Sequence, residues 1–300
     1  FNMICGGSPC QDFSVAGKQK GSVWTCKDCG HEYNPLTVHW SERDKCPECR
    51  SNNIEKTRSS LLVEYLRVIR ANKPNFGIYE NVKNIVGKQF KETTFKLFTD
   101  ELKEYGYNVY WKVLNAKDYG IPQNRYRVFF VGMKKEGFKF PEAYDYKVTT
   151  EEAIGDLPVL TGTEVVTEYS EEPKTEYEKL MRGDTKVLFN HAGTNHSQQT
   201  IDIISMIKDG GKIKDLPPEY WEVRKYNKAF ERMSSTGQSN TVDTGHRNYF
   251  HYKQNRIPSV RENARLQSFT DDFEFLGSKT SQYKQVGNAV PPLLAYVVAN

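Results

Sequence analysis

One cysteine of this chain, Cys10, stands in a setting that suits chemical attack on a substrate. It follows Ser8 and Pro9 in the stretch GGSPCQDFSVAG (residues 6–17), directly after the apolar run FNMIC. Proline fixes its own φ and pushes the preceding residue towards an extended conformation, so the approach to Cys10 is stiff. Because a thiolate is a strong nucleophile, we consider Cys10 a candidate nucleophile. A single cysteine without further signals is more often an ordinary half-buried residue.

Two further stretches carry charged groups next to predicted strands. Glu80 lies in YENV (residues 79–82), and a glutamic acid that leaves an apolar strand into a cleft can keep its proton near neutral pH. In QNRYRVFFVG (residues 123–132), Arg125 and Arg127 alternate along the chain, which predicts that both point to one face of a strand. Two guanidinium groups on one side suit an anionic or carbonyl-bearing ligand. Taken alone, Glu80 is more readily explained as a surface glutamate at a strand end, and the alternative for the arginines is a pair of exposed edge residues.

Four of the six cysteines form two closely spaced pairs. The pairs are CKDC at residues 26–29 and CPEC at residues 46–49, with sixteen residues between them. This spacing is typical of a zinc ribbon, in which four sulfur atoms surround one structural zinc ion. We therefore expect a zinc site formed by Cys26, Cys29, Cys46 and Cys49. The alternative is four free thiols, and His31 and His39 are spare ligands.

These side chains need secondary structure to position them, and the hydrophobic pattern predicts an α/β fold. Apolar residues recur at helical spacing in residues 59–72 and 90–107, and Gly106 is a candidate C-cap for the second helix. Four apolar stretches are typical of strands, the first two of them buried: residues 1–7, 74–80, 108–116 and 126–133. Strands that alternate with helices predict an α/β sheet whose functional residues lie at strand ends.

The composition changes along the chain and predicts its domains. Residues 142–189 are acidic and rich in turns, and dense patterning returns near residue 256. We therefore expect a catalytic α/β core at 1–141 with a zinc ribbon inserted at about 23–57, a lobe at 142–255, and a return to the core at 256–300.

The overall composition is that of a globular protein. Hydrophobic residues make up 37% and charged residues 27% of the chain, and no apolar run approaches the ~20 residues of a membrane span. We expect no membrane partner. The net charge of +4 permits a nucleic-acid partner without demanding one. Paired cysteines without a visible secretory signal favour a cytoplasmic location, although the chain begins with Phe1 and not with Met.

Five stretches in order resemble the DNA (cytosine-5)-methyltransferase family. They are GGSPCQDFS, ENV, QNRYRVFFVG, RIPSVRENARLQSF and QVGNAVPPLLA, and together they span nearly the whole chain. The resemblance implies that the Cys10 thiolate attacks carbon 6 of a cytosine and that carbon 5 then takes a methyl group from S-adenosylmethionine. Loss of the carbon-5 proton and expulsion of the cysteine restore the ring. The resemblance also implies a Rossmann-like methyltransferase sheet, a smaller target-recognition lobe and a restriction–modification setting.

The resemblance assigns roles to single residues as well. Protonated Glu80 would bond N3 of the cytosine, and Arg127, with Arg125, would hold O2 as charge develops on the ring. The base must be flipped out of double-stranded DNA before the thiolate can reach it. The remaining matches are DNA contacts at Gln11, Ser14 and Thr241, and cofactor contacts at Pro9 and Asn288. The basic stretch 206–232 is expected to face phosphates.

Two features depart from the family pattern. The glycine loop FxGxG, which binds S-adenosylmethionine in the family, does not occur in the chain, and Phe1 already lies in the strand before Cys10. We therefore expect a fragment or one half of the enzyme, inactive alone and completed by an N-terminal segment or a companion chain. The second departure is the cysteine segment. Its five positive and six negative residues argue against a strong grip on phosphates, and we interpret it as a brace for the catalytic loop or a contributor to selectivity.

Two other functions remain open from the sequence. One is a non-catalytic DNA-binding or regulatory subunit with the same fold, which the presence of Cys10, Glu80 and both arginines disfavours. The other is methylation of cytosine in RNA, because the same chemistry serves both nucleic acids. The sizeable lobe before RENARLQSF favours the reading of a DNA duplex.

Overall fold

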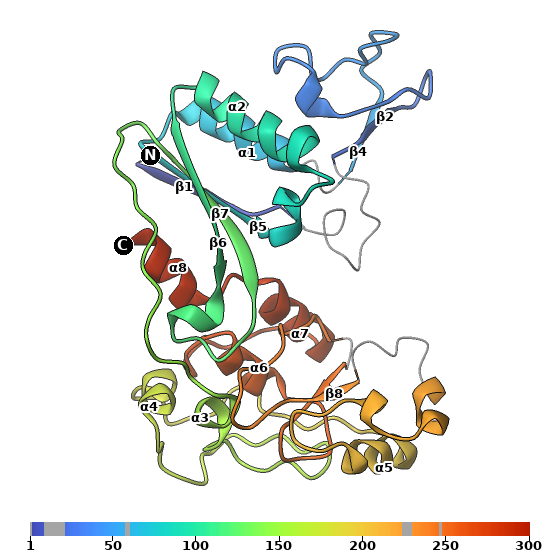
Figure 1. Cartoon of the computed structure of the whole chain (residues 1–300), viewed down its shortest axis with the longest axis vertical. Helices are drawn as coiled ribbons and strands as arrows, with labels where there is room; N and C mark the ends of the chain where they lie inside the picture. The colour runs from blue at the N-terminus through green and yellow to red at the C-terminus, as the bar shows by residue number, and fades with distance from the viewer. Residues whose placement is uncertain (1, 9–21, 58–60, 224–229, 246–247) are drawn as a thin grey trace. The chain divides into compact units, whose positions relative to one another are not determined.

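The computed structural model describes residues 2–8, 22–57, 61–223, 230–245 and 248–300 (Figure 1). Two compact units are present, and each is described by itself. The first contains residues up to 114 together with 126–140, and the second contains 115–125 together with 141–300. In the second unit, Gln123 hydrogen-bonds both Val242 and Leu266, so buried polar contacts join residues 115–125, 141–255 and 256–300, and the domain limits expected from the sequence remain a prediction. None of the helices in the described part of the chain combines the length and apolar character of a membrane span.

The first unit is built on a mixed four-stranded sheet. Its strands, in spatial order, are β1 (Met3–Gly6), β5 (Phe76–Val82), β7 (Tyr126–Met133) and β6 (Asn108–Asn115). β1 runs parallel to β5, and β7 runs antiparallel to β5. Two helices, α1 (Leu61–Asn72) and α2 (Lys96–Glu104), pack on the sheet through a shared aromatic and aliphatic core. The predicted α/β sheet is therefore confirmed, with β7 antiparallel to β5 within it.

Three local expectations for this unit can be compared with the structure. The first strand was expected to be buried, but β1 lies at the sheet edge and Met3 is 50% exposed. Gly106 has a φ of +81°, and its amide donates to the Lys103 carbonyl, so the predicted C-cap is confirmed. The second helix begins later than expected, because a π-helical turn at Lys91–Phe95 precedes α2.

The cysteine segment forms a small three-stranded antiparallel sheet. Its strands are β3 (Glu32–Tyr33), β2 (Trp24–Cys26) and β4 (Ile54–Lys56), with β2 in the centre. Trp24, Tyr33 and Leu36 belong to the same buried core as α1 and α2. The guanidinium of Arg70, on α1, lies 3.7 Å from the centre of the Trp40 ring. This small sheet is therefore packed onto the first unit rather than tethered loosely to it.

A buried ion pair also attaches the cysteine segment to α2. The Arg43 guanidinium donates to both carboxylate oxygens of Glu101 on α2, at 3.2 and 2.6 Å, and both side chains are less than one-tenth exposed. The Tyr105 hydroxyl also donates to Glu101, and Arg43 donates to the Val38 carbonyl. Breaking one partner of such a pair leaves an uncompensated buried charge.

We expect Glu101→Gln to lower the free energy of unfolding by roughly 3 kcal/mol, because Arg43 then keeps its charge without a carboxylate. Urea unfolding of the variant and the parent protein measures this difference. The double variant Arg43→Met/Glu101→Leu is the control, and it should regain most of the lost stability since no charge stays buried. A loss below about 1 kcal/mol in the single variant would show that water reaches the pair.

In the described residues of the second unit there are six short α-helices and little sheet. They are α3 (Thr150–Ile154), α4 (Glu176–Arg182), α5 (Gln198–Met206), α6 (Val260–Leu266), α7 (Lys279–Asn288) and α8 (Pro292–Ala299). Two strands of two residues each, β8 (Glu231–Arg232) and β9 (Tyr249–Phe250), pair in parallel. α3, α4 and α6 begin with a capping box, in which a Thr or Ser and a Glu three residues later satisfy each other's backbone amides.

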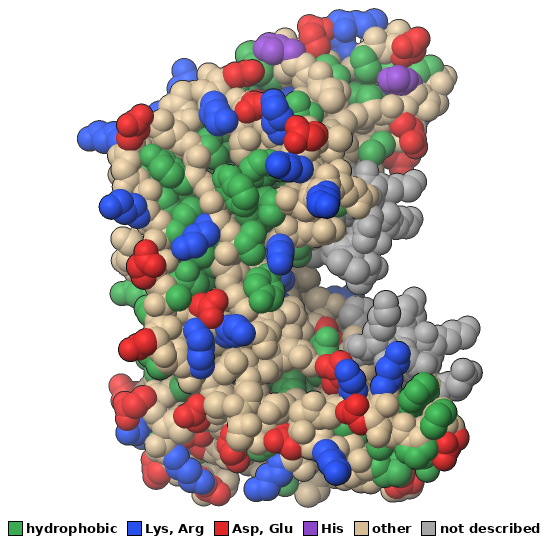
Figure 2. Space-filling view, in the orientation of Figure 1, with side chains coloured by type: hydrophobic (Ala, Val, Ile, Leu, Met, Phe, Trp, Pro, Cys, Tyr) green, Lys and Arg blue, Asp and Glu red, His purple; other side chains and the backbone are tan. Residues whose placement is uncertain are grey.

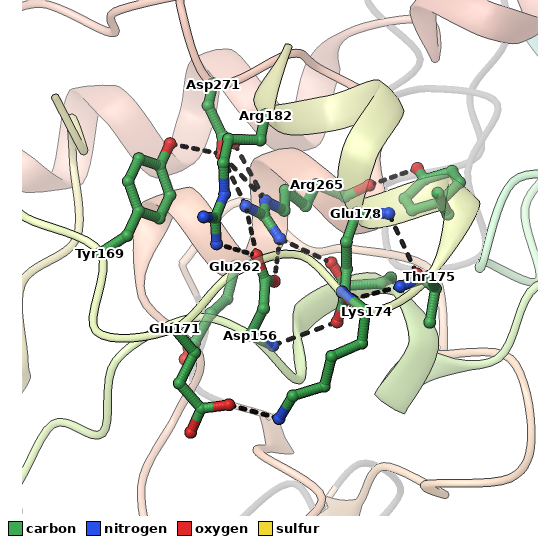
Figure 3. Close-up of polar contacts among 12 residues, drawn as sticks. Asp156, Tyr169, Glu171, Lys174, Thr175, Glu178, Arg182, Glu262, Arg265 and Asp271 are labelled. Carbon is green, nitrogen blue, oxygen red and sulfur yellow. Dashed lines mark hydrogen bonds and ion pairs between the residues drawn. The ribbon is translucent and has the colours of Figure 1, made fainter. Parts of the chain in front are cut away.

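A buried ionic network holds α3, α4 and α6 together (Figure 3). Arg265 on α6 is fully buried between the carboxylates of Asp156 and Asp271. Arg182 on α4 donates to Asp156 at 2.5 Å, and the Tyr169 hydroxyl donates to Asp271 at 2.7 Å. Each charge in the network has an opposite partner and hydrogen bonds, so the network is structural.

A second buried cluster makes the stability of this unit sensitive to acid. His251 is buried beside Glu262 and Arg256, and burial lowers the pKa of His251 to about 4. Burial also lowers the pKa of His191, whose Nε2 donates to the Pro158 carbonyl and whose Nδ1 hydrogen-bonds the Ser259 hydroxyl. In the unfolded chain a histidine binds a proton near pH 6.5, so acid favours unfolding.

We expect the contribution of His251 to leave the free energy of unfolding at its maximum above about pH 6.5. Between pH 6.5 and pH 4.5, protonation of His251 in the unfolded chain alone should lower the free energy of unfolding by roughly 2–3 kcal/mol. The folded state keeps His251 neutral in this range, whereas the unfolded state becomes protonated. Urea unfolding at several pH values measures the slope. His251→Asn is the control and should flatten it, and an unchanged slope in that variant would assign the acid sensitivity to other groups.

Candidate functional site

The register of β5 and β7 brings Glu80 and Arg127 to one face of the sheet. Val82 pairs with Arg127, and Glu80 lies two residues before Val82, so all three side chains point to the same side. Arg127 Nε lies 2.9 Å from Glu80 Oε1, and these side chains are 14% and 16% exposed. The sequence placed Glu80 at the end of the strand, whereas β5 continues to Val82. Arg127 and Glu80 thus form a half-buried ion pair on this face of the sheet.

The loop that leads to the predicted nucleophile lies against the same carboxylate. Gly6 of β1 pairs with Tyr79, and Gly7 follows it beside Glu80. A Cβ atom on Gly7 would lie 3.3 Å from Glu80 Oε2 and 3.4 Å from the Glu80 carbonyl oxygen. This space is tighter than an ordinary contact, so a glycine lets the backbone come close to the acid.

Polar side chains of β5 fix the loop at Ser8. The Asn81 amide donates to the Ser8 carbonyl and hydroxyl, at 3.3 Å each, and to the Tyr79 hydroxyl at 3.2 Å. The Ser8 and Tyr79 hydroxyls are 2.5 Å apart, and burial raises the pKa of Tyr79 to about 12. Sequence reasoning missed Tyr79 and Asn81 as positioning residues. The available signal was a buried asparagine inside an otherwise apolar strand.

Four of the predicted site residues lie outside the described residues. They are Pro9, Cys10, Gln11 and Ser14. The described chain reaches Ser8, two positions before Cys10, and this is the residue that Tyr79 and Asn81 hold. The predicted acid, one predicted arginine and the anchor of the nucleophile loop therefore lie together in the first unit.

The structure corrects the expectation for Arg125. Arg125 and Arg127 were expected to share one strand face, but β7 begins at Tyr126 and Arg125 precedes it, in the second unit. Arg125 is 1% exposed, and its guanidinium donates to the carbonyls of Gly287 and Ala289, at 2.8 and 2.9 Å. These backbone acceptors, which the sequence could not indicate, hold Arg125 in the interior of the second unit.

The second unit contains the two other predicted contact residues that the structure describes. Thr241 is exposed, and its hydroxyl donates to the Asn124 carbonyl at 2.6 Å. Asn288 is exposed at the C-terminal end of α7. A polar residue that sequence reasoning missed, Gln123, is fully buried, and it hydrogen-bonds the backbone of both Val242 and Leu266.

The basic stretch 206–232 divides into exposed and buried residues. Lys208, Lys212 and Lys214 are exposed. Arg232, by contrast, is 6% exposed and donates to the carbonyls of Ile204 and Ile207, so its expected role towards phosphates is wrong. Three further basic residues of the stretch lie outside the described residues: Arg224, Lys225 and Lys228. On the face shown in Figure 2, basic and acidic side chains are interspersed.

Comparison with known proteins shows to which family the chain belongs. The family described as C-5 cytosine-specific DNA methylase matches residues 1–28 and 40–300. The chain belongs to the C-5 cytosine-specific DNA methylases. It is a DNA cytosine-5 methyltransferase, and S-adenosylmethionine is the methyl donor that the family implies. The unmatched residues 29–39 fall inside the cysteine segment, as an insertion into this methylase fold would produce.

Relatives agree with this family, and one solved structure shares the fold. The chain is 35% identical to the Type II methyltransferase M1.HphI of Haemophilus parahaemolyticus, over 99% of the chain and 67% of that relative. It is 31% identical to the Type II methyltransferase M.DdeI of Desulfomicrobium norvegicum, over 99% of the chain and 71% of that relative. A prophage-encoded methyltransferase of E. coli has the same fold, with a TM-score of 0.70 at 21% identity, over 99% of this chain and 77% of that one. These comparisons do not support the expected companion chain.

The four paired cysteines of this methylase converge on one point. Their sulfur atoms all lie within 4.8 Å of one another, with Cys26 and Cys49 at 3.5 Å and Cys29 and Cys46 at 3.7 Å. A tetrahedral zinc ion with Zn–S bonds of about 2.3 Å requires sulfur atoms about 3.8 Å apart. The donor set and its spacing therefore fit zinc.

The backbone around the two cysteine pairs repeats one hydrogen-bonding pattern. The Cys26 carbonyl accepts from the Gly30 amide, and the Cys26 amide donates to the His31 carbonyl. Cys46 repeats both bonds with Arg50 and Ser51, four and five residues later. The fourth residue has a left-handed backbone in each turn, with φ of +76° at Gly30 and +64° at Arg50. Two equivalent turns thus present four sulfur atoms to one centre.

Proposed function

We propose that Cys10 is the nucleophile, with Glu80 and Arg127 as the groups that stabilise the attacked cytosine. Attack at carbon 6 moves electrons towards N3 and O2 of the ring. A protonated Glu80 donates to N3, and the Arg127 guanidinium donates to O2. These two donors stabilise the negative charge that develops on the ring in the transition state. The pairing of Glu80 with Arg127 beside the Ser8 anchor is the observation that carries this assignment.

The ion pair implies an order of events. Without a ligand, Arg127 favours the carboxylate of Glu80. Entry of the cytosine ring excludes water and offers O2 to Arg127, which weakens its hold on the acid. Glu80 then takes up a proton and shares it with N3. The methyl donor is S-adenosylmethionine, and Asn288 with Pro9 supply polar and packing contacts to it, since the exposed Asn288 amide can both donate and accept.

A transfer assay tests the function against its alternatives. The protein with its complete natural coding sequence is incubated with methyl-labelled S-adenosylmethionine and with duplex DNA, single-stranded DNA or structured RNA of matched sequence. Label is expected on carbon 5 of cytosine in duplex DNA. Label on RNA alone would favour RNA methylation, and sequence-specific DNA binding without transfer would favour a regulatory subunit. The expectation that residues 1–300 are inactive by themselves is tested in parallel.

We propose that residues 142–255 recognise the DNA sequence. Thr241 and the segment 239–245 lie at the end of this lobe, and with Gln11 and Ser14 they form the proposed DNA contacts. Exposed lysines near 206–214 supply contacts to phosphates, while less charged segments reach base edges.

Replacing Lys212 and Lys214 by glutamine is expected to weaken binding to all DNA sequences alike. The slope of log K against log salt should fall by about 2, because each phosphate contact contributes about 1. Lys135 and Lys139 are the matched control pair. They are exposed and follow Met133, which pairs with Phe76 at the end of β5 away from Glu80. A changed target sequence with an unchanged salt slope would contradict the role of Lys212 and Lys214.

We propose that the cysteine segment binds one structural zinc ion and braces the nucleophile loop. Cys26, Cys29, Cys46 and Cys49 hold the ion, and the Arg43–Glu101 pair joins the zinc ribbon to α2. The segment begins where the loop after Cys10 ends, so a rigid ribbon fixes the far end of that loop. Four thiolate ligands leave no open position, so the ion is structural.

A further inference from the structure

We propose that Arg125 is a positioning residue for the S-adenosylmethionine side of the site and does not contact the cytosine ring. It acts through the turn that carries Asn288. This inference rests on the proposed function for one element only, the placement of Asn288 against S-adenosylmethionine.

The guanidinium of Arg125 clamps both sides of that turn. Its Nη2 atom donates to the Gly287 carbonyl at 2.8 Å and to the Ala289 carbonyl at 2.9 Å. Asn288, between these two residues, is exposed, whereas Arg125 is 1% exposed. One buried nitrogen therefore binds the backbone carbonyls of both residues that flank Asn288, which fixes the backbone from which its exposed carboxamide projects.

The position of the turn also favours a cation. The carbonyls of Gly287 and Ala289 lie at the C-terminal end of α7, where the helix dipole is negative. Ala289 has an extended backbone, so the chain leaves the helix there, and Gln267 donates to the Ala289 carbonyl at 2.6 Å. Arg125 and Gln267 thus supply the donors that the helix end lacks.

The turn is held against the predicted DNA-facing segment. A Cβ atom on Gly287 would lie 2.4 Å from the Asp243 carbonyl oxygen, so the backbones touch there and only glycine fits. Gln123, fully buried, accepts from the Val242 amide at 2.9 Å and donates to Gln267 at 2.5 Å. The same buried group of side chains therefore fixes Asn288 and the segment that contains Thr241.

Lysine cannot replace Arg125 in this role. Its ammonium is a compact charge on a flexible chain, whereas the planar guanidinium holds a fixed orientation towards two carbonyls. Arg125→Lys keeps the charge and loses the clamp, so it separates positioning from electrostatics.

Calorimetric titration with S-adenosylmethionine tests the proposal in the protein with its complete natural coding sequence. Arg125→Lys is expected to raise the Kd about tenfold, because loss of one buried hydrogen bond has this effect. Formation of the covalent adduct with DNA that contains 5-fluorocytosine, at saturating S-adenosylmethionine, should change less than about threefold. Arg127→Lys is the matched control, and it should show the reverse, an unchanged Kd and a loss of adduct.

A double-variant cycle asks whether Arg125 acts through Asn288. In an Asn288→Ala background, Arg125→Lys should raise the Kd for S-adenosylmethionine less than about twofold, since the positioned amide is already absent. If Arg125→Lys does not fold, the same two measurements are made on Gln267→Met, which removes the other hydrogen-bond donor to the Ala289 carbonyl. The same outcomes then support or overturn the inference. Loss of adduct at saturating S-adenosylmethionine with an unchanged Kd in Arg125→Lys, or full additivity in the cycle, would overturn the inference. Normal adduct in Arg127→Lys would instead contradict the proposed function and leave the role of Arg125 standing.

Discussion

Replacing Cys10 by serine is expected to lower the rate of methyl transfer to DNA by roughly 10³-fold or more. A serine hydroxyl is almost entirely protonated near pH 7, whereas a cysteine thiol forms a thiolate far more readily. Carbon 5 of cytosine cannot accept a methyl group until carbon 6 carries a nucleophile. Transfer of labelled methyl groups to duplex DNA, measured under single-turnover conditions, gives the ratio of the two rates.

A trapping experiment identifies the attacking atom directly. With 5-fluorocytosine in the target, the parent enzyme should form a stable adduct with DNA, because fluorine does not leave carbon 5 as the proton does. Cys10→Ser should form no adduct. Cys5→Ser is the control: Cys5 is the exposed cysteine of β1, and its change should leave the adduct intact. An adduct that persists in Cys10→Ser would exclude Cys10 as the nucleophile.

Loss of the zinc site is the second large effect that we expect. Cys46→Ser removes one of four ligands and should reduce bound zinc from about one ion per chain to nearly none. The segment 22–57 has short strands and few core residues of its own, so metal binding supplies much of its folding free energy. Elemental analysis of protein purified without added metal measures the zinc. Protection of the β2 and β4 amides from hydrogen exchange reports the fold.

The same pair of measurements can contradict the zinc proposal. Cys5→Ser again serves as the control, and this variant should keep its zinc because Cys5 is not a member of the four-sulfur cluster. Removal of zinc from the parent protein by a chelator should expose the β2 and β4 amides in the same way. A folded segment with four reduced thiols and no metal would show that the ribbon is stable without an ion.

Much of the first unit could be predicted from local pattern. The apolar patterns of α1, β5 and β7 appear in the sequence because α1 and β5 each bury one face and β7 is buried on both, and Gly106 marks a helix end by its need for a left-handed backbone. The two CxxC pairs predicted a four-sulfur cluster, since their spacing alone limits which metal geometry they can form.

The partners of the charged residues depended on tertiary structure. Glu80 was expected at a strand end with its proton, but the β5–β7 register places Arg127 beside it, and register is a property of two strands. Arg43 looked like one of several charges in a weakly acidic segment. It is buried against Glu101, 58 residues away, and this pairing attaches the ribbon to α2.

The two arginines of QNRYR show where sequence reasoning ends. The sequence by itself determined that both are present, two residues apart, next to a strand of this family. Only the tertiary structure decided that Arg127 faces Glu80 while Arg125 binds the carbonyls of Gly287 and Ala289. The physical reason is that a buried guanidinium must find acceptors wherever the fold supplies them, and backbone carbonyls are present at every residue. No residue type marks such a partner in advance.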